Sequence, residues 1–328
     1  MKKEKNNSTK QLMPYTTPRL ELLETFNENR ENAYCVAFSP NKKTFAAAGG
    51  LRSVFIYDAF EKKPIGGLTD HRQSVYALLF APSGRWFFST GRDGFVFVYD
   101  EKFDKVATLL PEYDMATANP QLYPNYSLAL NANETELAVG ATGGVLRIYD
   151  TETWKLKSVF PVHQGNIRSV AYSSNGKLMA TGSSDRTVNI IHPETKTVLQ
   201  TISGHADTVF SVLFSPDSKL FMTGGKDARL RIWDVEGTEL KPKVKILAHT
   251  FSIKAMAYLP ISQELITVSQ DKTIKRWDFE NAVCLETVDR TFGGHIFTIN
   301  SVAISTDEKF LVTGSDDKKV KLWSILSN

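Results

Sequence analysis

The sequence has 328 residues, a hydrophobic share of 42%, a charged share of 23% and a formal net charge of +3. This is the composition of an ordinary soluble globular protein, and the charge is smaller than that of most nucleic-acid-binding domains. Only two cysteines occur, Cys35 and Cys284, both in apolar, strand-like runs, which excludes a disulfide framework and favours a reducing compartment.

Residues 1–18 are polar, contain several lysines and lack the apolar core of a signal peptide. We expect them to form a disordered tail ahead of one domain over residues 19–328. No apolar run approaches the ~18 residues that a membrane-spanning helix needs. A membrane is therefore not expected among the partners, and the expected location is the cytoplasm, or the nucleus if the source is eukaryotic.

Seven copies of one spacing rule follow along the chain. In the best-kept copies a histidine lies 22 residues before an aspartate, a serine or threonine four before it, and a tryptophan or tyrosine six after it. The aspartate position holds Leu51, Asp93, Gly143, Asp185, Asp227, Asp271 and Asp317, and the histidine position holds Asn29, His71, Gln121, His163, His205, His249 and His295. All length variation falls between one tryptophan position and the next histidine position, so the chain is a repeat of at least 42 residues.

Each copy contains four strand-like segments. In the fifth, Lys196–Ile202, Val209–Phe214, Lys219–Gly224 and Leu230–Val235 are rich in apolar and β-branched residues, and turn-forming residues separate them. Four antiparallel strands in such a period predict one blade of a propeller. A single blade cannot bury both of its faces, so the blades must pack around an axis and close into a ring.

The combination of Gly-His, Asp and Trp-Asp at these spacings resembles the WD-repeat β-propellers over residues 19–328. The resemblance implies an all-β, seven-bladed β-propeller of four-stranded antiparallel blades. It also implies closure by the N-terminal strand, with Arg19–Thr25 beside Val320–Ile325 in the last blade. Blades one and three depart from the family pattern because they lack the histidine and the aspartate, and blade four has Ile-Ile-His where Trp-Asp is expected.

The recurring histidine, hydroxyl and aspartate are also the groups of a hydrolase triad. Nucleophilic catalysis needs one such set in one pocket, whereas this chain has five, so we interpret them as structural. In the family the tryptophan indole binds the hydroxyl, the hydroxyl binds the histidine and the histidine meets the aspartate. Five of six histidines are used in this way and no cluster has zinc-like spacing. We predict no enzymatic activity, no metal and no cofactor.

By the resemblance, three positions in each blade point outward around the central channel: three and five residues after the histidine and one before the aspartate. Among these twenty-one residues Asp316 is the only acid, while aromatic and basic side chains recur. Such side chains are typical of binding sites for anionic partners. The candidate partner-binding residues are Tyr34, Tyr76, Arg92, Tyr126, Arg168, Phe210, Lys226 and Lys254. The alternative is that the aromatic residues are core and the basic residues are ordinary solvated surface.

One interval between copies is eight residues longer than the shortest, and the extra length falls in Pro111–Asn125. This loop is expected to return to the channel face near Arg92 and Tyr126. It either extends a groove there or is a neutral insertion, since loops accept added length at small cost.

The sequence thus predicts a non-enzymatic protein–protein interaction scaffold, expected to be a subunit of a larger complex. Its partner would be a peptide or loop, acidic or phosphorylated, held on the face around the channel. Two alternatives come from other classes: an RNA-binding propeller, which would use the same cations and aromatic rings, and an enzyme with a site at the channel mouth. Nothing in the sequence names the partner.

Overall fold

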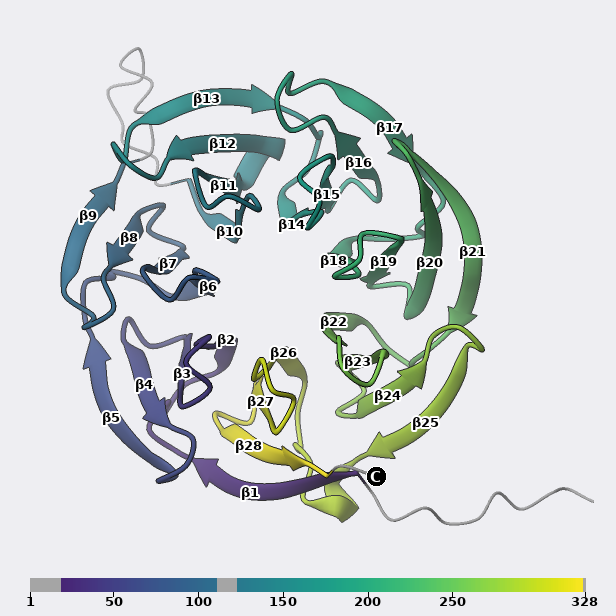
Figure 1. The fold of residues 1–328 in the computed structure, drawn as a ribbon. Helices are drawn as coiled ribbons and strands as arrows, with labels where there is room; N and C mark the ends of the chain where they lie inside the picture. Colours follow the sequence, from purple (N-terminus) through teal and green to yellow (C-terminus); the bar gives the residue numbers. More distant parts are fainter. Residues whose placement is uncertain (1–18, 111–122, 327–328) are drawn as a thin grey trace, which may run out of the picture.

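The computed structural model describes residues 19–110 and 123–326. In this part, seven four-stranded antiparallel sheets stand as blades around a central axis (Figure 1). The predicted all-β, seven-bladed propeller is therefore confirmed. The expected N-terminal tail and residues 111–122 of the expected insertion lie outside the described residues.

Blades one to six each take four consecutive strands, from the inner strand at the axis to the outer strand at the circumference. Blades one to three are β2 (Ala33–Phe38), β3 (Thr44–Gly49), β4 (Val54–Asp58), β5 (Lys63–Leu68); β6 (Val75–Phe80), β7 (Phe87–Gly91), β8 (Val96–Tyr99), β9 (Lys105–Leu109); and β10 (Asn125–Leu130), β11 (Glu136–Ala141), β12 (Val145–Asp150), β13 (Leu156–Pro161). Blades four to six are β14 (Ile167–Tyr172), β15 (Met179–Ser183), β16 (Val188–Ile191), β17 (Val198–Ile202); β18 (Val209–Phe214), β19 (Leu220–Gly225), β20 (Arg229–Glu236), β21 (Glu239–Leu247); and β22 (Ile253–Leu259), β23 (Glu264–Ser269), β24 (Ile274–Asp278), β25 (Val283–Val288). Blade seven is β26 (Ile299–Ile304), β27 (Phe310–Ser315), β28 (Val320–Ile325) and β1 (Leu20–Phe26), and two 3₁₀ turns are η1 (Thr142–Gly144) and η2 (Arg290–Phe292).

The turns between strands are fixed by their own polar side chains, as the turn from β18 to β19 shows. The Ser215 hydroxyl accepts a hydrogen bond from the backbone N–H of Leu220 at 2.9 Å and donates to Asp217 at 2.6 Å, while Asp217 accepts from the N–H of Lys219 at 3.0 Å. Short polar side chains that bond to nearby backbone favour turns over continued strand. The four strands predicted in the fifth copy of the repeat correspond to β17, β18, β19 and β20 to within one or two residues at their ends, and the first of them, β17, pairs in blade four.

The hydrophobic core is divided into seven buried clusters in the described residues, one at each boundary between neighbouring blades. Neighbouring blades approach closely there. A Cβ atom on Gly224 of β19 would lie 2.7 Å from the Ile253 side chain of blade six. The ring is thus held by apolar packing between blades, because every blade buries both of its faces against its neighbours.

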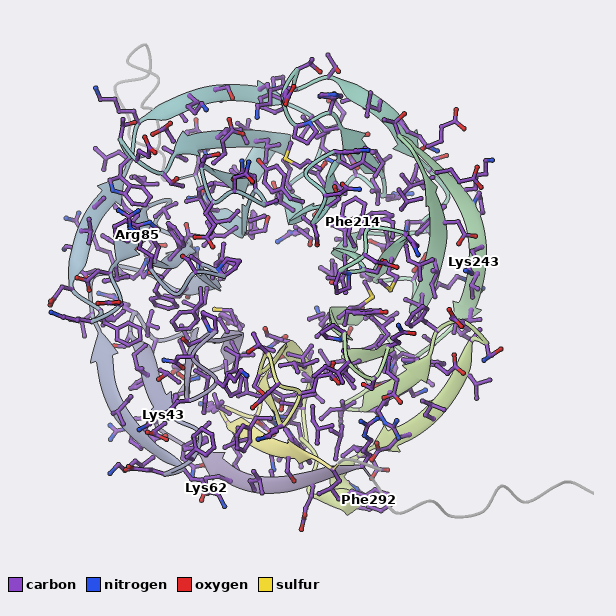
Figure 2. The ribbon with its side chains drawn as sticks, in the orientation of Figure 1. Lys43, Lys62, Arg85, Phe214, Lys243 and Phe292 are labelled. Carbon is purple, nitrogen blue, oxygen red and sulfur yellow. The ribbon has the colours of Figure 1, made fainter. Side chains whose placement is uncertain are left out.

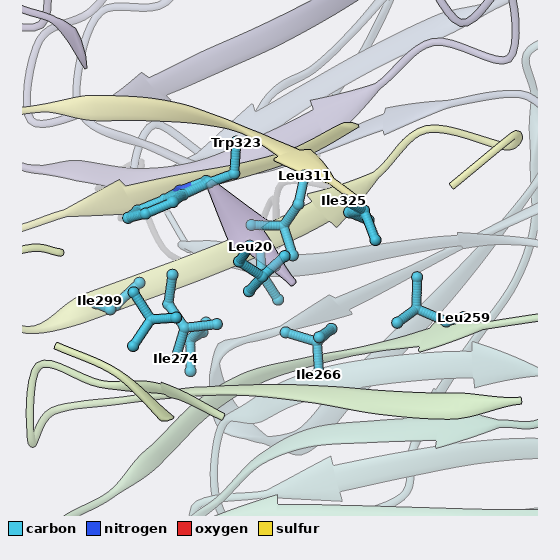
Figure 3. Close-up of a cluster of buried hydrophobic side chains, with 11 residues drawn as sticks. Leu20, Leu259, Ile266, Ile274, Ile299, Leu311, Trp323 and Ile325 are labelled. Atoms are coloured by element: carbon cyan, nitrogen blue, oxygen red, sulfur yellow. The ribbon is translucent and has the colours of Figure 1, made fainter. Parts of the chain in front are cut away.

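The ring closes in blade seven, where the first and last described strands pair. β1 runs antiparallel to β28, with Leu22 opposite Trp323 and Phe26 opposite Val320. Leu20 lies in the same buried cluster as Trp323 and blade-six residues such as Ile266 (Figure 3). The expected closure by the N-terminal strand is therefore observed, and it covers a strand edge that would otherwise be open to aggregation.

A polar network that the sequence did not reveal ties β1 to blade six. Arg19 lies 3.1 Å from Glu264, which also accepts from Arg276 at 2.8 Å, and Arg276 donates to Glu286 at 3.0 Å. Glu286 in turn accepts from the backbone N–H of Leu20 at 3.2 Å. These groups are largely shielded from solvent, so they fix the position of β1 more firmly than exposed ion pairs would.

We call the two faces of the disc the upper and lower faces. The upper face holds the histidine and aspartate positions and the loops that lead from each outer strand to the next inner strand. The lower face holds the turns between the first and second strands and between the third and fourth strands of each blade.

Candidate functional site

The recurring histidine, hydroxyl and aspartate lie together as trios in five blades, and in four of them the histidine is hydrogen-bonded directly to both partners. In blade seven His295 Nδ1 lies 2.8 Å from Asp317 and its Nε2 lies 2.8 Å from Thr313 Oγ1, which also accepts from the Trp323 indole at 3.0 Å. Blade six repeats the arrangement through Trp277, whose indole donates to Thr267 at 2.9 Å. These side chains satisfy one another in the interior, as the structural interpretation predicts.

The ionisation of the trios follows from their burial. Burial lowers the pKa of His249 and His295, because desolvation penalises the imidazolium, and the neighbouring carboxylates only partly oppose this effect. Burial alone would raise the pKa of Asp317, but the hydrogen bonds from His295 and from the backbone N–H groups of Ile296 and Lys319 outweigh it and the pKa is lowered. A neutral histidine beside an ionised aspartate is thus the favoured pairing.

Blade five departs from the expected chain of bonds. Arg231 donates to His205 Nδ1 at 2.8 Å and to Asp227 at 2.7 Å, and the histidine and aspartate themselves are 3.5 Å apart. Since a guanidinium can only donate, His205 Nδ1 must accept here and its Nε2–H must donate to Thr223. The tautomer is therefore opposite to that of the other trios, which spacing alone did not predict.

Arg231 belongs to a second recurring position, four residues after the aspartate, that the sequence analysis missed. Its guanidinium also donates to the carbonyl of Gly204 at 2.8 Å, Lys275 donates to the carbonyl of Ala248 at 2.8 Å, and Lys321 donates to the carbonyl of Gly293 at 2.7 Å. Each cation thus pins the loop ahead of its histidine. The signal in the sequence was a basic residue in the otherwise apolar third strand.

Blades one and three lack the trio, and other residues occupy the positions of its histidine and aspartate. In blade one Asn29 takes the histidine position, and neither polar atom of its buried side chain has a partner among the described residues. In blade three Gly143 takes the aspartate position inside η1 with a left-handed φ of 70°, and its N–H donates to Asn166 at 3.1 Å.

The channel mouth on the upper face is lined by one residue from each blade. A cavity of about 380 Å³ has the following lining: Tyr34, Tyr76, Tyr126, Arg168, Phe210, Lys254 and Asn300. All seven occupy the position five residues after the histidine, and each is half-buried. We call these residues the mouth ring. The central opening is visible in the side-chain view (Figure 2).

A β-bulge in every inner strand explains why these side chains converge. In β2 the pairing with β3 passes from Ala33 to Cys35 and skips Tyr34, and in β14 it passes from Ile167 to Ser169 and skips Arg168. The same irregularity occurs at the mouth-ring residue of the other five inner strands. A bulged residue leaves the strand's alternation and is re-aimed, so all seven leave the interblade core and face the channel.

The mouth ring has an aromatic arc. The Tyr34 and Tyr76 rings are 5.8 Å apart, the Tyr76 and Tyr126 rings stack at 5.6 Å, and the Arg168 guanidinium lies 4.2 Å from the Tyr126 ring centre. Across the channel Lys254 Nζ lies 4.3 Å from the Phe210 ring centre. Cations seated on aromatic faces in this way are attracted by the ring quadrupole.

Burial lowers the pKa of Lys254; Asp316 opposes this, and the positive charges of Arg168 and Lys226 add to it. Neither Arg168 nor Lys254 forms an ion pair with a carboxylate in the described part of the chain, and Arg168 spends only its Nε on the Ser184 hydroxyl at 2.8 Å. The one acid among the outward positions, Asp316, accepts from Asn300 at 2.7 Å. The mouth therefore holds two cations that form no ion pair with a carboxylate of the described residues.

Two of the eight candidate residues lie outside the mouth. Arg92 and Lys226 are exposed on the upper face and do not line the cavity. Lys226 forms an ion pair with Asp207 at 3.0 Å, an acid that lies outside the outward positions considered in the sequence. The seventh lining residue, Asn300, was not among the candidates because its side chain is neither aromatic nor charged.

The described residues contain no group of three histidine, cysteine, aspartate or glutamate side chains arranged to hold a metal ion. Within the same ranges no helix combines the length and the apolar character needed to cross a bilayer.

Comparison with known families identifies the family of the repeats. The family described as "WD domain, G-beta repeat" (WD40) matches residues 20–58, 62–100, 154–192, 196–234, 240–278 and 286–324. The chain belongs to the WD40 repeat family. The matched stretches leave out residues 101–153, where blade three lacks the histidine and aspartate of the WD40 pattern.

A curated relative of this WD40 chain matches over a short stretch. The nuclear distribution protein PAC1 of Tuber melanosporum (strain Mel28) is 39% identical over 61 residues. The alignment covers 18% of this chain and 13% of that protein, so it supports kinship of repeats and not a shared role.

Proposed function

We propose that this WD40 propeller is a non-enzymatic interaction scaffold that holds an acidic or phosphorylated peptide or loop on its upper face. WD40 propellers are typical protein-interaction scaffolds, and the chain's membership of that family supports this class of function. The observation that carries the finer proposal is the pair of half-buried cations at the mouth, Arg168 and Lys254, which lie on aromatic rings and form no ion pair with a described carboxylate.

The basic and the aromatic residues of the mouth ring can bind different parts of one partner. Arg168 and Lys254 would orient a carboxylate or phosphate, because charge-assisted hydrogen bonds are short and directional. The arc of Tyr34, Tyr76 and Tyr126 would bury an adjacent side chain, since rigid aromatic residues give large contact area at small entropic cost. The exposed Arg92 and Lys226 would add longer-range attraction at the edge of the site.

The geometry of the trios supports a scaffold over an enzyme. Each histidine, hydroxyl and aspartate set is engaged within its own blade and shields a tryptophan or a loop, as in blades six and seven. The expected cytoplasmic or nuclear location and membership of a larger complex remain part of this proposal.

The proposal is tested with arrays of peptides present in unmodified, glutamate-substituted and phosphorylated forms, followed by fluorescence titration of the best binders. The double variant Arg168→Glu/Lys254→Glu should weaken binding by about a hundredfold, since each lost charge-assisted bond contributes roughly 1.5 kcal/mol or more. The control is Lys219→Glu/Lys309→Glu, which makes the same charge change at highly exposed positions on the lower face.

Unchanged affinity in the mouth variant, with its thermal midpoint preserved, would show that the mouth is not the site. If oligoribonucleotides bind instead, with an affinity that falls steeply with salt while no peptide binds, the propeller is an RNA-binding module.

A further inference from the structure

Five large apolar side chains stand more than half exposed on the upper loops and strand ends of blades five to seven. They are Leu247, Phe251, Phe292, Ile296 and Phe297. Phe251 and Phe297 occupy equivalent positions, two residues after the histidine of blades six and seven, and Phe292 lies at the outer edge of blade seven (Figure 2). We call these five residues the apolar rim.

The loops that carry the apolar rim are held firmly by the trios. Asp271 accepts from the backbone N–H of Thr250 at 3.0 Å, and Asp317 accepts from that of Ile296 at 3.1 Å. The Ser269 hydroxyl donates to the carbonyl of Phe251 at 3.2 Å. Because the backbone is anchored on both sides of the tips, the exposed rings are presented by a fixed loop shape.

The fold does not need apolar residues at these tips. Two residues after the histidine position, blades one, two, four and five have polar or small residues, which are Glu31, Gln73, Gly165 and Asp207. In blades two and five the same loop bonds form, since Asp93 accepts from Arg72 N–H at 2.9 Å and Asp227 accepts from Ala206 N–H at 3.2 Å. The phenylalanines of blades six and seven are therefore not explained by folding, and large exposed apolar side chains gathered on one face of a protein mark contact surfaces.

Basic side chains accompany the apolar rim. Lys272 Nζ lies 5.9 Å from the Phe297 ring centre, and Lys318 follows Asp317 on the next blade. In the described ranges neither of these lysines, nor Lys319, forms an ion pair with a carboxylate. Of the acids beside them in the sequence, Asp271 and Asp317 are engaged in their trios and Asp316 accepts from Asn300.

We propose that the apolar rim and its lysines form a peripheral contact surface for an anionic lipid bilayer. Phenylalanine and isoleucine tips would enter the headgroup boundary while Lys272, Lys318 and Lys319 meet lipid phosphates and carboxylates. The hot spots of protein interfaces lie in well-packed pockets, whereas these side chains are spread over separate loops and one strand end of three blades, which fits a fluid interface better. This surface contact is distinct from a membrane span, and it departs from the expectation, based on the sequence, that a membrane is not among the partners.

The test is flotation of the full-length protein with vesicles of phosphatidylcholine alone and with about one fifth phosphatidylserine. The protein should float with the anionic vesicles only, and less at raised salt. Phe251→Ser/Phe297→Ser should lower the bound fraction about tenfold or more, and Lys272→Glu/Lys318→Glu should do the same. The control is Ile65→Ser/Val106→Ser, which removes apolar side chains that are about half exposed from β5 and β9.

Circular dichroism and thermal midpoints establish that all variants are folded. The mouth variant Arg168→Glu/Lys254→Glu should still float, which separates this proposal from the peptide site. Absence of flotation at low salt overturns the proposal, and so does flotation that the Phe251/Phe297 variant retains. Loss of a protein partner by that variant, with no vesicle binding by the parent protein, would assign the rim to a protein interface instead.

Discussion

Replacing Thr313 by valine tests whether the trios are structural. Valine has nearly the shape of threonine but no hydroxyl, so the substitution removes the shared partner of the Trp323 indole and the His295 imidazole. Both rings are fully buried, and water cannot replace the lost bonds. Each orphaned group costs about 1–3 kcal/mol, so the free energy of unfolding should fall by about 3 kcal/mol. For a domain of this size that is a drop of about 5 °C in the thermal midpoint.

Blade five provides an internal comparison for this prediction. Thr223 contacts His205 at 2.9 Å, but among the described residues no hydrogen bond joins it to the indole of Trp233. Thr223→Val should therefore orphan one group and cost about half as much as Thr313→Val. The assay is thermal unfolding followed by circular dichroism, with urea unfolding as a second measurement. A Thr313→Val protein as stable as the parent, or equal losses at the two positions, would refute the reasoning.

Two further predictions concern pH and ring closure. Burial lowers the pKa values of His163, His205, His249 and His295 in the folded protein. In the unfolded chain these histidines have a pKa near 6.5 and therefore bind more protons, so stability should be complete above about pH 6.5 and fall as the pH drops below it. This pH dependence is measured as the thermal midpoint between pH 8 and pH 5, and His295→Gln should make the midpoint less dependent on pH. A midpoint that rises on acidification would contradict the prediction. Truncation through Phe26 removes β1 and exposes the edge of β28, so the protein should lose cooperative unfolding and aggregate. Truncation through Pro18 is the matched control. If the longer deletion is soluble and unfolds cooperatively, closure of the ring does not depend on β1.

Much of the fold could be predicted because every copy of the repeat keeps the same spacing between its marked positions. The fixed separation of histidine and aspartate reflects a geometric requirement. In every blade with a trio the two side chains must meet at the upper end of the blade, as His71 and Asp93 do in blade two. The seven copies then determine the number of blades, and the alternation of apolar runs with turn residues determines the strands. Departures such as Gly143 were readable as missing groups, but what replaces those groups was not.

The sequence by itself determined the seven-bladed ring and the structural nature of the trios, because these follow from local spacing repeated many times, whereas the closing strand was implied by the resemblance to the WD-repeat family. Only the tertiary structure decided which side chains share a space. The bulges that turn Tyr34 and Arg168 into the channel, the insertion of Arg231 between His205 and Asp227, and the anchoring of Arg19 by Glu264 all depend on strand register and on contacts between segments far apart in the chain. The bulges recur at one position of every inner strand, but only the strand register shows that they re-aim a side chain. The contacts of Arg231 and Arg19 are each made once, by residues that the folded ring brings together, and leave no recurring interval in the sequence.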